Sequence, residues 1–434
     1  ALGGLAVLLR LAHDILERLD EVRLDSEVLC FALATTFAAS LIAGLVPAWR
    51  AARTDAAEVL RGSASRTSTS GVGARRLRHL LVAVETSVST LLLATAALLT
   101  ASFTRLVHAD DGFRAPDVVT TELTIAAAKY NSAADRVAFY QRLLAMVAAA
   151  PGVTTAAIST ALPLQGETEV QKVWSQGDTR PVAERLLANV RYTSVDFFAA
   201  LGIPVAKGEI FREIDRGRNA VILSSQLADR LWPGQDPIGR KVLCGDGTPT
   251  ELEVMGVVGD VRVNADQPPV AMMYRPYWVS PQLDAELVAR TSAPVPAVAA
   301  ALREAVRQVD PDVPVGRFRT MGDLLQAALA QRRFQMHLVA AFALSALTLV
   351  GLGLYGVVSH SVTQRTREFG IRIAFGAGAT EIHRLVLRQA LAPVAWGLVV
   401  GVAGALAGGR VLASLLYETE ARNPAALAAV AGML

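Results

Sequence analysis

Four stretches of this 434-residue chain contain no charged side chain over about the twenty residues that a helix needs to cross a bilayer core. They are Val28–Val46, Thr86–Thr104, Leu338–Val358 and Ala390–Gly409. Inside lipid every backbone amide and carbonyl needs a partner within the protein, so a helix is the expected structure of each. The alternative, a buried helix in the core of a large soluble protein, would have to occur four times in one chain. We therefore predict an α-helical transmembrane bundle.

The composition agrees with a membrane protein and argues against several other classes. Hydrophobic residues make up 52% of the chain and charged residues only 19%, unlike a disordered chain, a coiled coil or an ordinary soluble enzyme. The net charge of +3 is not gathered into one basic stripe, so nucleic acid is not an expected partner. The two cysteines, Cys30 and Cys244, supply neither a disulfide framework nor a paired metal motif.

Two local features of the predicted spans suggest how they are used. Glycines recur in the last span at intervals near three or four residues, which predicts a face that packs closely on another helix: Gly397, Gly401, Gly404, Gly408 and Gly409. Glu85, at the edge of the second span, is open to two interpretations. It either reaches the interface or pairs with Arg75 or Arg78, which we favour, or it acts in transport.

Arginines in the short connections predict which side of the membrane each connection occupies. An arginine-rich connection follows the first span, and another, from Arg365 to Arg388, joins the last two. Both are expected in the cytoplasm, because positive charge is retained there, whereas the opposite short loops are acidic. This arrangement places the long segment from about Leu106 to Gln335 outside the cytoplasm.

The two ends of the chain show the same order of sequence features, as if each were the start of the same repeated unit. Ala1–Ala12 is apolar and is followed by a short acidic loop and a span that begins at Val28. Ala390–Gly409 is likewise followed by an acidic loop, with Glu418 and Glu420, and by a new apolar run. We interpret the chain as beginning inside one repeat and stopping inside the next. Chance similarity between two apolar hairpins is the alternative.

The long segment is expected to form an α+β domain with two βαβ units. The first unit is predicted from three segments, a strand, a helix and a strand: Val118–Ile125, Ala133–Ala150 and Val153–Ser159. The second is predicted in the same way: Glu286–Arg290, Val295–Val309 and Val313–Arg319. Between them a stretch with many Gly and Pro residues and a strand at Leu252–Val261 predicts an inserted β-rich subdomain. A helix from about Met321 runs without a breaker towards Leu338, so the third span is expected to project from the bilayer as a stalk.

No catalytic, cofactor or metal site is predicted from the sequence. The six histidines avoid the body of the long segment, which excludes a Ser–His–Asp triad or a histidine-ligated zinc there: His13, His79, His108, His337, His360 and His383. The neighbouring acids Asp110 with Asp111, and Glu167 with Glu169, are expected to be solvated loops rather than acid–base pairs. Gly234 to Lys241 lacks the Ser or Thr of a phosphate loop and precedes a strand. ATP-driven work would therefore need another polypeptide.

Three runs of sequence carry a family resemblance. The loop Gln364–Ala377 reads QRTREFGIRIAFGA, and Pro47–Asp55 reads PAWRAARTD. The third run lies in the long segment: Gly202-Ile203-Pro204, Gly208, Asp236–Gly239 and Val254–Asp260. In this order they resemble the MacB/FtsX-type ABC transporter permeases, whose loop is roughly R-x-R-E-I-G-I-R-x-A-L-G-A and whose unit closes with P-A-x-R-A-A-R-x-D-P. This chain differs from the family at Phe369 and Phe375, where aliphatic residues are usual, and at Ala56, where Pro is usual.

The resemblance implies a duplicated permease and its partners. The implied parts are the tail of a first FtsX-like unit (1–62), a cytoplasmic linker (63–79), the first helix of a second unit (80–106), a MacB-like periplasmic core domain with its stalk (107–335), and an FtsX-like unit without its last helix (336–434). A multi-pass protein of the bacterial inner membrane is implied, as a dimer or pseudodimer of permease units in contact with membrane lipid. Its implied partners are a cytoplasmic ABC ATPase and a periplasmic protein. Such permeases act as levers for export or extraction of a substrate, rather than as pores.

The arginine-rich loop is the predicted ATPase-coupling site. Its residues are Arg365, Arg367, Glu368, Gly370, Arg372 and Gly376, and the cytoplasmic exit motif consists of Pro47, Arg50, Arg53 and Asp55. The charges alternate with apolar residues, so a short interfacial helix is expected to turn Phe369, Ile371, Ile373 and Phe375 towards lipid or ATPase and the arginines towards acidic groups. Glycines here, including Gly378, are expected to allow close approach and chain reversal. A generic positive-inside anchor is the alternative for the arginines.

Two other functions fit the same architecture. A membrane regulator would transmit the state of the ATPase to a periplasmic cell-wall hydrolase or signalling partner. A membrane-anchored enzyme is opposed by the missing histidines and metal spacing. We expect a mechanotransmitting permease subunit, which is not itself an enzyme.

Overall fold

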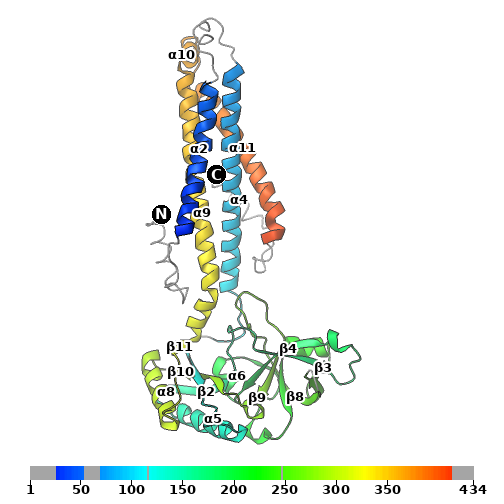
Figure 1. Ribbon diagram of the computed structural model, residues 1–434. Coiled ribbons are helices and arrows are strands. Elements are labelled where there is room, and N and C mark those ends of the chain that lie inside the picture. Colours follow the sequence, from blue (N-terminus) through cyan, green and yellow to red (C-terminus); the bar gives the residue numbers. More distant parts are fainter. Residues whose placement is uncertain (1–25, 53–68, 115–116, 246–247, 413–434) are drawn as a thin grey trace. The chain divides into compact units, whose positions relative to one another are not determined.

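Four long helices hold the apolar stretches within the described part of the chain. The computed structural model describes residues 26–52, 69–114, 117–245 and 248–412. The helices are α2 (Ser26–Ala52), α4 (Thr69–Val107), α9 (Met321–Gln364) and α11 (Ala379–Leu412) (Figure 1). The described residues contain three segments long and apolar enough to cross a membrane: His79–Val107, Met321–Ser359 and Ala379–Ala407.

The predicted spans fall in these helices. The second, third and fourth lie in α4, α9 and α11, which confirms them as long apolar helices. The first, Val28–Val46, lies within α2, which is helical from Ser26 to Ala52. Hydroxyl groups within the helices bond to the preceding turn, as Thr90 Oγ1 does to the Thr86 carbonyl at 2.7 Å. Such bonds satisfy a hydroxyl in an apolar helix without an outside partner.

Helix α11 packs on α4 through small residues. A Cβ on Gly397 would lie 2.5 Å from the Ala83 carbonyl oxygen, and one on Gly401 would lie 2.5 Å from the Thr90 Cβ. Only a residue without a side chain permits this approach. The predicted packed face is confirmed at these two glycines, whereas a Cβ on Gly404 would have no described atom within 4 Å.

The described chain divides into two compact units. One contains the helices up to Thr104 and from Arg332 onward, and the other is Arg105–Gln331. The second unit holds an eleven-stranded sheet. Its short connecting helices are α6 (Phe197–Leu201) and α7 (Ser225–Leu231), with 3₁₀ turns η2 (Val182–Glu184), η3 (Glu213–Asp215) and η4 (Tyr277–Val279).

Two strand–helix–strand segments interleave at one end of the sheet. The first consists of β1 (Val118–Thr124), α5 (Ala133–Ala148) and β2 (Val153–Ser159). The second consists of β10 (Asp284–Thr291), α8 (Val295–Val309) and β11 (Arg319–Thr320). The strand order is β11-β1-β10-β2, so β10 separates β1 from β2 and is antiparallel to both. Each segment therefore pairs with strands of the other, and β2 also pairs with β4 at Ser159 and Thr193.

Seven strands of the described chain lie between β2 and β10 in sequence, and all but β5, which pairs with β8 outside the ring, form a closed ring. They are β3 (Glu169–Ser175), β4 (Leu186–Thr193), β5 (Val205–Gly208), β6 (Ala220–Ser224), β7 (Lys241–Cys244), β8 (Thr250–Val258) and β9 (Met272–Pro276). The order β4-β3-β7-β8-β6-β9 closes because β9 also pairs with β4 in parallel. Closure leaves these six strands without an open edge. They occupy the stretch where the sequence predicts an inserted β-rich subdomain.

Helical spacing buries one face of α5 against the sheet. Its buried residues are Phe139, Tyr140, Leu143 and Val147, and the helix begins where the Ser132 hydroxyl accepts from the Asp135 amide. They join α8 and the ring interior in one hydrophobic cluster. A second cluster contains α6 and the outer side of β6, β8 and β9. Met321 and Leu324, in the first turn of α9, belong to this second cluster, so α9 is anchored in the domain core.

Two predicted strands differ most from the structure. The strand predicted at Val313–Arg319 is wrong, because β11 covers only Arg319–Thr320 and Val315 makes a single bridge to Leu123. Pro314 has no amide hydrogen to give to a ladder, which explains the interruption. The strand predicted at Leu252–Val261 ends at Val258, since the next amide, of Gly259, donates to Pro204 instead.

Candidate functional site

The predicted coupling residues lie on and beside one short helix, α10 (Thr366–Ala374), between α9 and α11. Glu368 stands one helical turn from Arg365 and one from Arg372, because residues three or four apart share a face. Glu368 Oε1 accepts from Arg372 Nη2 at 2.7 Å, and its Oε2 lies 3.8 Å from Arg365 Nε. The three side chains thus form one charged stripe, in which the carboxylate is held between two guanidinium groups.

Arg365 also ties α10 to the following helix. Its Nη1 donates to Gln389 Oε1 of α11 at 3.2 Å. Gln389 could not be identified from the sequence, because nothing in the linear pattern marks a residue 24 positions away as the partner of Arg365. Arg367 lies in the same helix, but its side chain is outside the described set.

Gly376 ends α10 in a way that needs glycine. The amide of Gly376 donates to the Ile373 carbonyl and that of Ala377 to the Arg372 carbonyl, the two bonds of a Schellman motif. Gly376 has φ +94°, a conformation that side-chain-bearing residues avoid. The expected chain reversal is confirmed here. A Cβ on Gly370 would meet no described atom within 4 Å, so that glycine is not required for packing within the described chain.

The apolar residues of the loop do not share one side, contrary to the expectation. Phe369 is buried, with 8% of its surface exposed, whereas Ile371 and Ile373 are exposed and Phe375 is 88% exposed. Alternation in sequence places residues on one face of a strand, but in a helix it distributes them around the axis. The exposed apolar surface is therefore Ile371, Ile373 and Phe375, beside the charged stripe.

The exit motif is only partly described. Pro47 and Arg50 lie in the last turns of α2, and their side chains are outside the described set. Arg53 and Asp55 lie outside the described residues. The structure therefore does not bring this motif into a described contact with α10.

Glu85 faces a glycine of the neighbouring helix rather than a described cation. A Cβ on Gly353 of α9 would lie 2.7 Å from Glu85 Oε2. The side chains of Arg75 and Arg78, the partners considered from the sequence, are outside the described set.

Three of the neighbouring acids considered from the sequence, Asp110, Asp111 and Glu169, make local contacts. Asp110 Oδ1 accepts from the Gly112 amide, and Asp111 lies 3.9 Å from Arg262. Burial raises the pKa of Asp111, opposed by the Arg262 charge. Glu169 accepts from the Gln171 amide group. The sequence Gly234 to Lys241 leads into strand β7, and Lys241 pairs with Glu251 at 2.5 Å, so its ammonium is already occupied.

Family models match most of the two units. Residues 90–309 match the MacB-like periplasmic core domain, and residues 340–431 match the FtsX-like permease C-terminal segment. Relatives include the macrolide export ATP-binding/permease protein MacB of Azoarcus sp. strain BH72, 30% identical over 54% of this chain and 36% of that protein. The probable syringafactin export protein SyfD of Pseudomonas syringae pv. tomato is 26% identical over 61% and 42%, respectively. The chain thus spans well under half the length of these curated relatives.

Solved structures also align with part of the chain. The periplasmic region of MacB from Actinobacillus actinomycetemcomitans aligns with a TM-score of 0.34 and 12% identity, covering 51% of this chain and 96% of that one. The extracellular domain of the transporter YknZ aligns with a TM-score of 0.32 and 15% identity, covering 46% and 100%.

Proposed function

The chain belongs to the family with a MacB-like periplasmic core domain and an FtsX-like permease segment, and on this premise we propose that it is the permease component of an ABC exporter. In this proposal a separate cytoplasmic ATPase binds at α10, and the unit Arg105–Gln331 lies outside the cytoplasm. Movement of α9 transmits the state of the ATPase to that unit, which drives export or extraction of a substrate. A dimer or pseudodimer of permease units in the inner membrane, with a periplasmic protein partner, completes the proposed assembly.

The continuity of α9 is the observation that carries the proposal. This single helix of 44 residues begins with Met321 in the core of one unit and ends at Gln364, next to α10. At about 1.5 Å per residue, it is about 66 Å long, enough to cross a bilayer and extend beyond it. A continuous helix that begins in a folded domain and leads into an exposed charged helix can convey displacement without a substrate channel.

The surface of α10 suits contact with a protein partner. Ile371, Ile373 and Phe375 expose apolar surface beside paired charges. Aromatic and arginine residues together are typical of interface centres, where burial of apolar surface supplies affinity and charge supplies specificity. Phe369 is buried, and Arg365 donates a hydrogen bond to Gln389 of α11. These two side chains hold α10 and its exposed surface in place.

Co-purification with the ATPase tests the contact. In the full-length permease, Phe375→Ala removes the most exposed aromatic of α10 and is expected to lower ATPase recovery at least tenfold. Leu352→Ala on α9, which is 64% exposed within the apolar span, is the matched control and is expected to leave recovery unchanged. Equal recovery with both variants would contradict α10 as the docking element.

Thiol labelling tests the orientation. Thr366→Cys and Gln235→Cys are placed at exposed positions in a background without Cys30 and Cys244. An impermeant maleimide applied to intact spheroplasts is expected to label position 235 and to reach position 366 only after the membrane is opened. The reverse pattern would overturn the proposed topology, and with it the coupling mechanism.

A further inference from the structure

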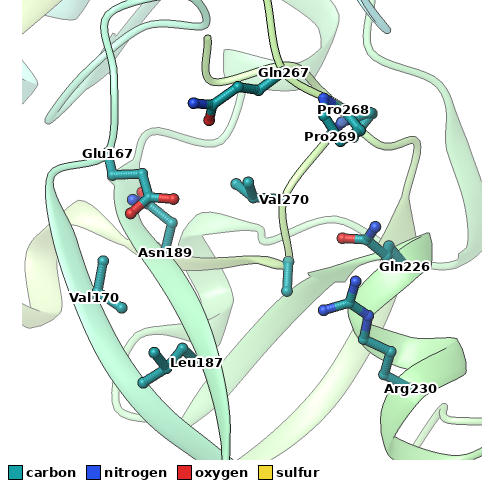
Figure 2. Close-up of a pocket in the computed structure, with 11 residues that line it drawn as sticks. Glu167, Val170, Leu187, Asn189, Gln226, Arg230, Gln267, Pro268, Pro269 and Val270 are labelled. Carbon is teal, nitrogen blue, oxygen red and sulfur yellow. The ribbon is translucent and has the colours of Figure 1, made fainter. Parts of the chain in front are cut away.

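A cleft of about 380 Å³ opens on the outer side of the strand ring, beside β4 (Figure 2). Three parts of the chain form it: β3 with β4, helix α7, and the segment that leads into β9. Its lining residues are Glu167, Val170, Leu187, Asn189, Gln226, Arg230, Gln267, Pro268, Pro269, Val270 and Ala271. None of these residues takes part in the proposed coupling mechanism.

Asn189 has an unpaired amide in the wall of this cleft. Its side chain is only 3% exposed, and neither Oδ1 nor Nδ2 has a hydrogen-bond partner in the described structure. Its backbone amide is already used, since it donates to the Ala271 carbonyl. The side chain lies opposite Val170 in the β3–β4 register, on the face away from the ring interior. Buried amides are nearly always paired, so this one calls for an explanation.

Gln226 adds a second unpaired group to the same wall. Its Oε1 is buried without a described partner, although its backbone amide donates to Asp260. Together Asn189 and Gln226 offer one unused donor group and two unused acceptors at one cleft. A primary or secondary amide of a ligand, with its N–H and C=O, is the complementary group.

Opposite charges stand on two sides of the cleft. Figure 2 shows Glu167 beside Asn189 and Arg230 beside Gln226. Neither charged side chain has an ion pair or hydrogen bond with the described residues, and both are exposed. An ammonium group suits the carboxylate, and a carboxylate suits the planar guanidinium. A ligand with both charges and an amide between them would satisfy the whole set.

The remaining lining is apolar and small. Val170, Leu187, Pro268, Pro269 and Val270 provide aliphatic walls, and the described lining contains no aromatic side chain on which a sugar or a base could stack. The volume is at the lower end of the range of small-molecule sites, about 300–1,000 Å³. A folded partner would not enter, whereas a few residues of an extended chain would.

We propose that this cleft binds a short zwitterionic peptide with aliphatic side chains. Its carboxylate pairs with Arg230, its amino group with Glu167, and a central peptide group with Asn189 and Gln226. Binding would be a property of the unit Arg105–Gln331 and would not require an ATPase. Success or failure of this inference is therefore independent of the proposed coupling function.

Equilibrium dialysis of the full-length protein in nanodiscs tests the inference. The probe is a pool of unmodified tripeptides with Ala, Val and Leu side chains, mixed with the same peptides bearing an N-acetyl group or a C-terminal amide. Retention of the unmodified peptides at least tenfold above the doubly blocked ones is expected. Equal retention of free and blocked peptides, or no saturable retention at millimolar concentration, would overturn the proposal.

Three variants separate recognition from folding. Arg230→Gln is expected to weaken binding of free-carboxylate peptides at least tenfold and to leave C-terminal amides unaffected. Lys207→Gln, another exposed cation of the same unit, is the matched control and should change neither. Asn189→Leu is expected to abolish binding while raising the unfolding temperature, because it replaces an unpaired buried amide by an apolar side chain. Unchanged binding in both Arg230→Gln and Asn189→Leu would assign the peptides to another site and refute this one.

Discussion

Thr86 of α4 lies directly against Gly397 of α11: a Cβ on the glycine would fall 2.6 Å from the Thr86 Cβ. Real Cβ atoms do not approach so closely, so any side chain at position 397 must push the two helices apart. Thr86 is itself fully buried, which leaves it no room to move aside. The pair therefore sets the distance between α4 and α11.

Gly397→Leu should destabilise the helical unit. Overpacking of this kind costs about 1–3 kcal/mol, because neighbouring backbone must shift. Gly404→Leu is the matched control on the same helix, since a Cβ there meets no described atom within 4 Å. Thermal unfolding in detergent should show a lower midpoint for the first variant alone. Equal midpoints would mean that the two helices do not pack as the structure shows.

Gly376→Ala should disturb the end of α10. Its φ of +94° imposes a cost of about 1–2 kcal/mol on a residue with a Cβ. Gly370→Ala, in the middle of the same helix, should instead be neutral or stabilising by up to about 1 kcal/mol, because alanine is the better helix former. Stability of the two variants and stimulation of the ATPase by each would be compared. A more harmful effect of Gly370→Ala on stability would contradict the Schellman assignment.

Asp310 should contribute stability that is lost in acid. Burial alone would raise its pKa, but hydrogen bonds from Lys129 Nζ at 2.8 Å, Tyr130 Oη at 2.7 Å and the Asp312 amide lower the pKa below its usual value. A lowered folded-state pKa means that the stabilisation is complete above the unfolded-state pKa, about 3.9, and is lost as the pH falls through the folded-state value.

Asp310→Asn should therefore lower the free energy of unfolding at pH 7 by about 1.5–3 kcal/mol, the usual value of a hydrogen bond to a charged group. The difference from the wild type should shrink below about pH 4. Denaturant unfolding followed by tryptophan fluorescence provides the measurement, and the exposed Asp312→Asn is the control, expected to change stability by less than about 1 kcal/mol. A difference that grows towards low pH would refute the assignment.

Local signals predicted several elements well, and non-local pairing explains the failures. Helix α8 begins and ends where its sequence pattern predicts, because its apolar residues repeat at helical spacing and Pro296 stands in its first turn. The predicted strand at Val313–Arg319 failed because its bonding depends on Pro314 and on the distant Glu122, whose carbonyl accepts from Gly316.

The charged stripe of α10 and the cleft at Asn189 also differ in how far the local sequence indicates them. Contiguous residues carry the charged stripe of α10, so a motif could locate it, but the alternating pattern does not indicate that Phe369 is buried while Phe375 is exposed. The cleft at Asn189 exists only because β4 pairs with β9, about eighty residues later in the chain. No local pattern around Asn189 indicates that its amide lies unpaired in the wall of a cleft.

A charge exchange within α10 would distinguish a structural role of the stripe from recognition. The Glu368–Arg372 pair is partly exposed, so it adds only about 0.3–0.5 kcal/mol to helix stability. Glu368→Ala or Arg372→Ala alone should therefore leave the protein folded. The double variant Glu368→Arg with Arg372→Glu rebuilds an ion pair on the helix but presents the charges to a partner in reverse order.

If the stripe recognises the ATPase, the exchange should leave co-purification and ATPase stimulation at least tenfold below the wild type, as each single variant does. If the pair only stabilises α10, the exchange should restore both, because the intrahelical attraction returns. Thermal unfolding of all three variants provides the control, with midpoints close to the wild type expected in each. Full recovery in the exchanged protein would assign the charges to the helix itself and leave the exposed Phe375, with Ile371 and Ile373, as the remaining docking surface.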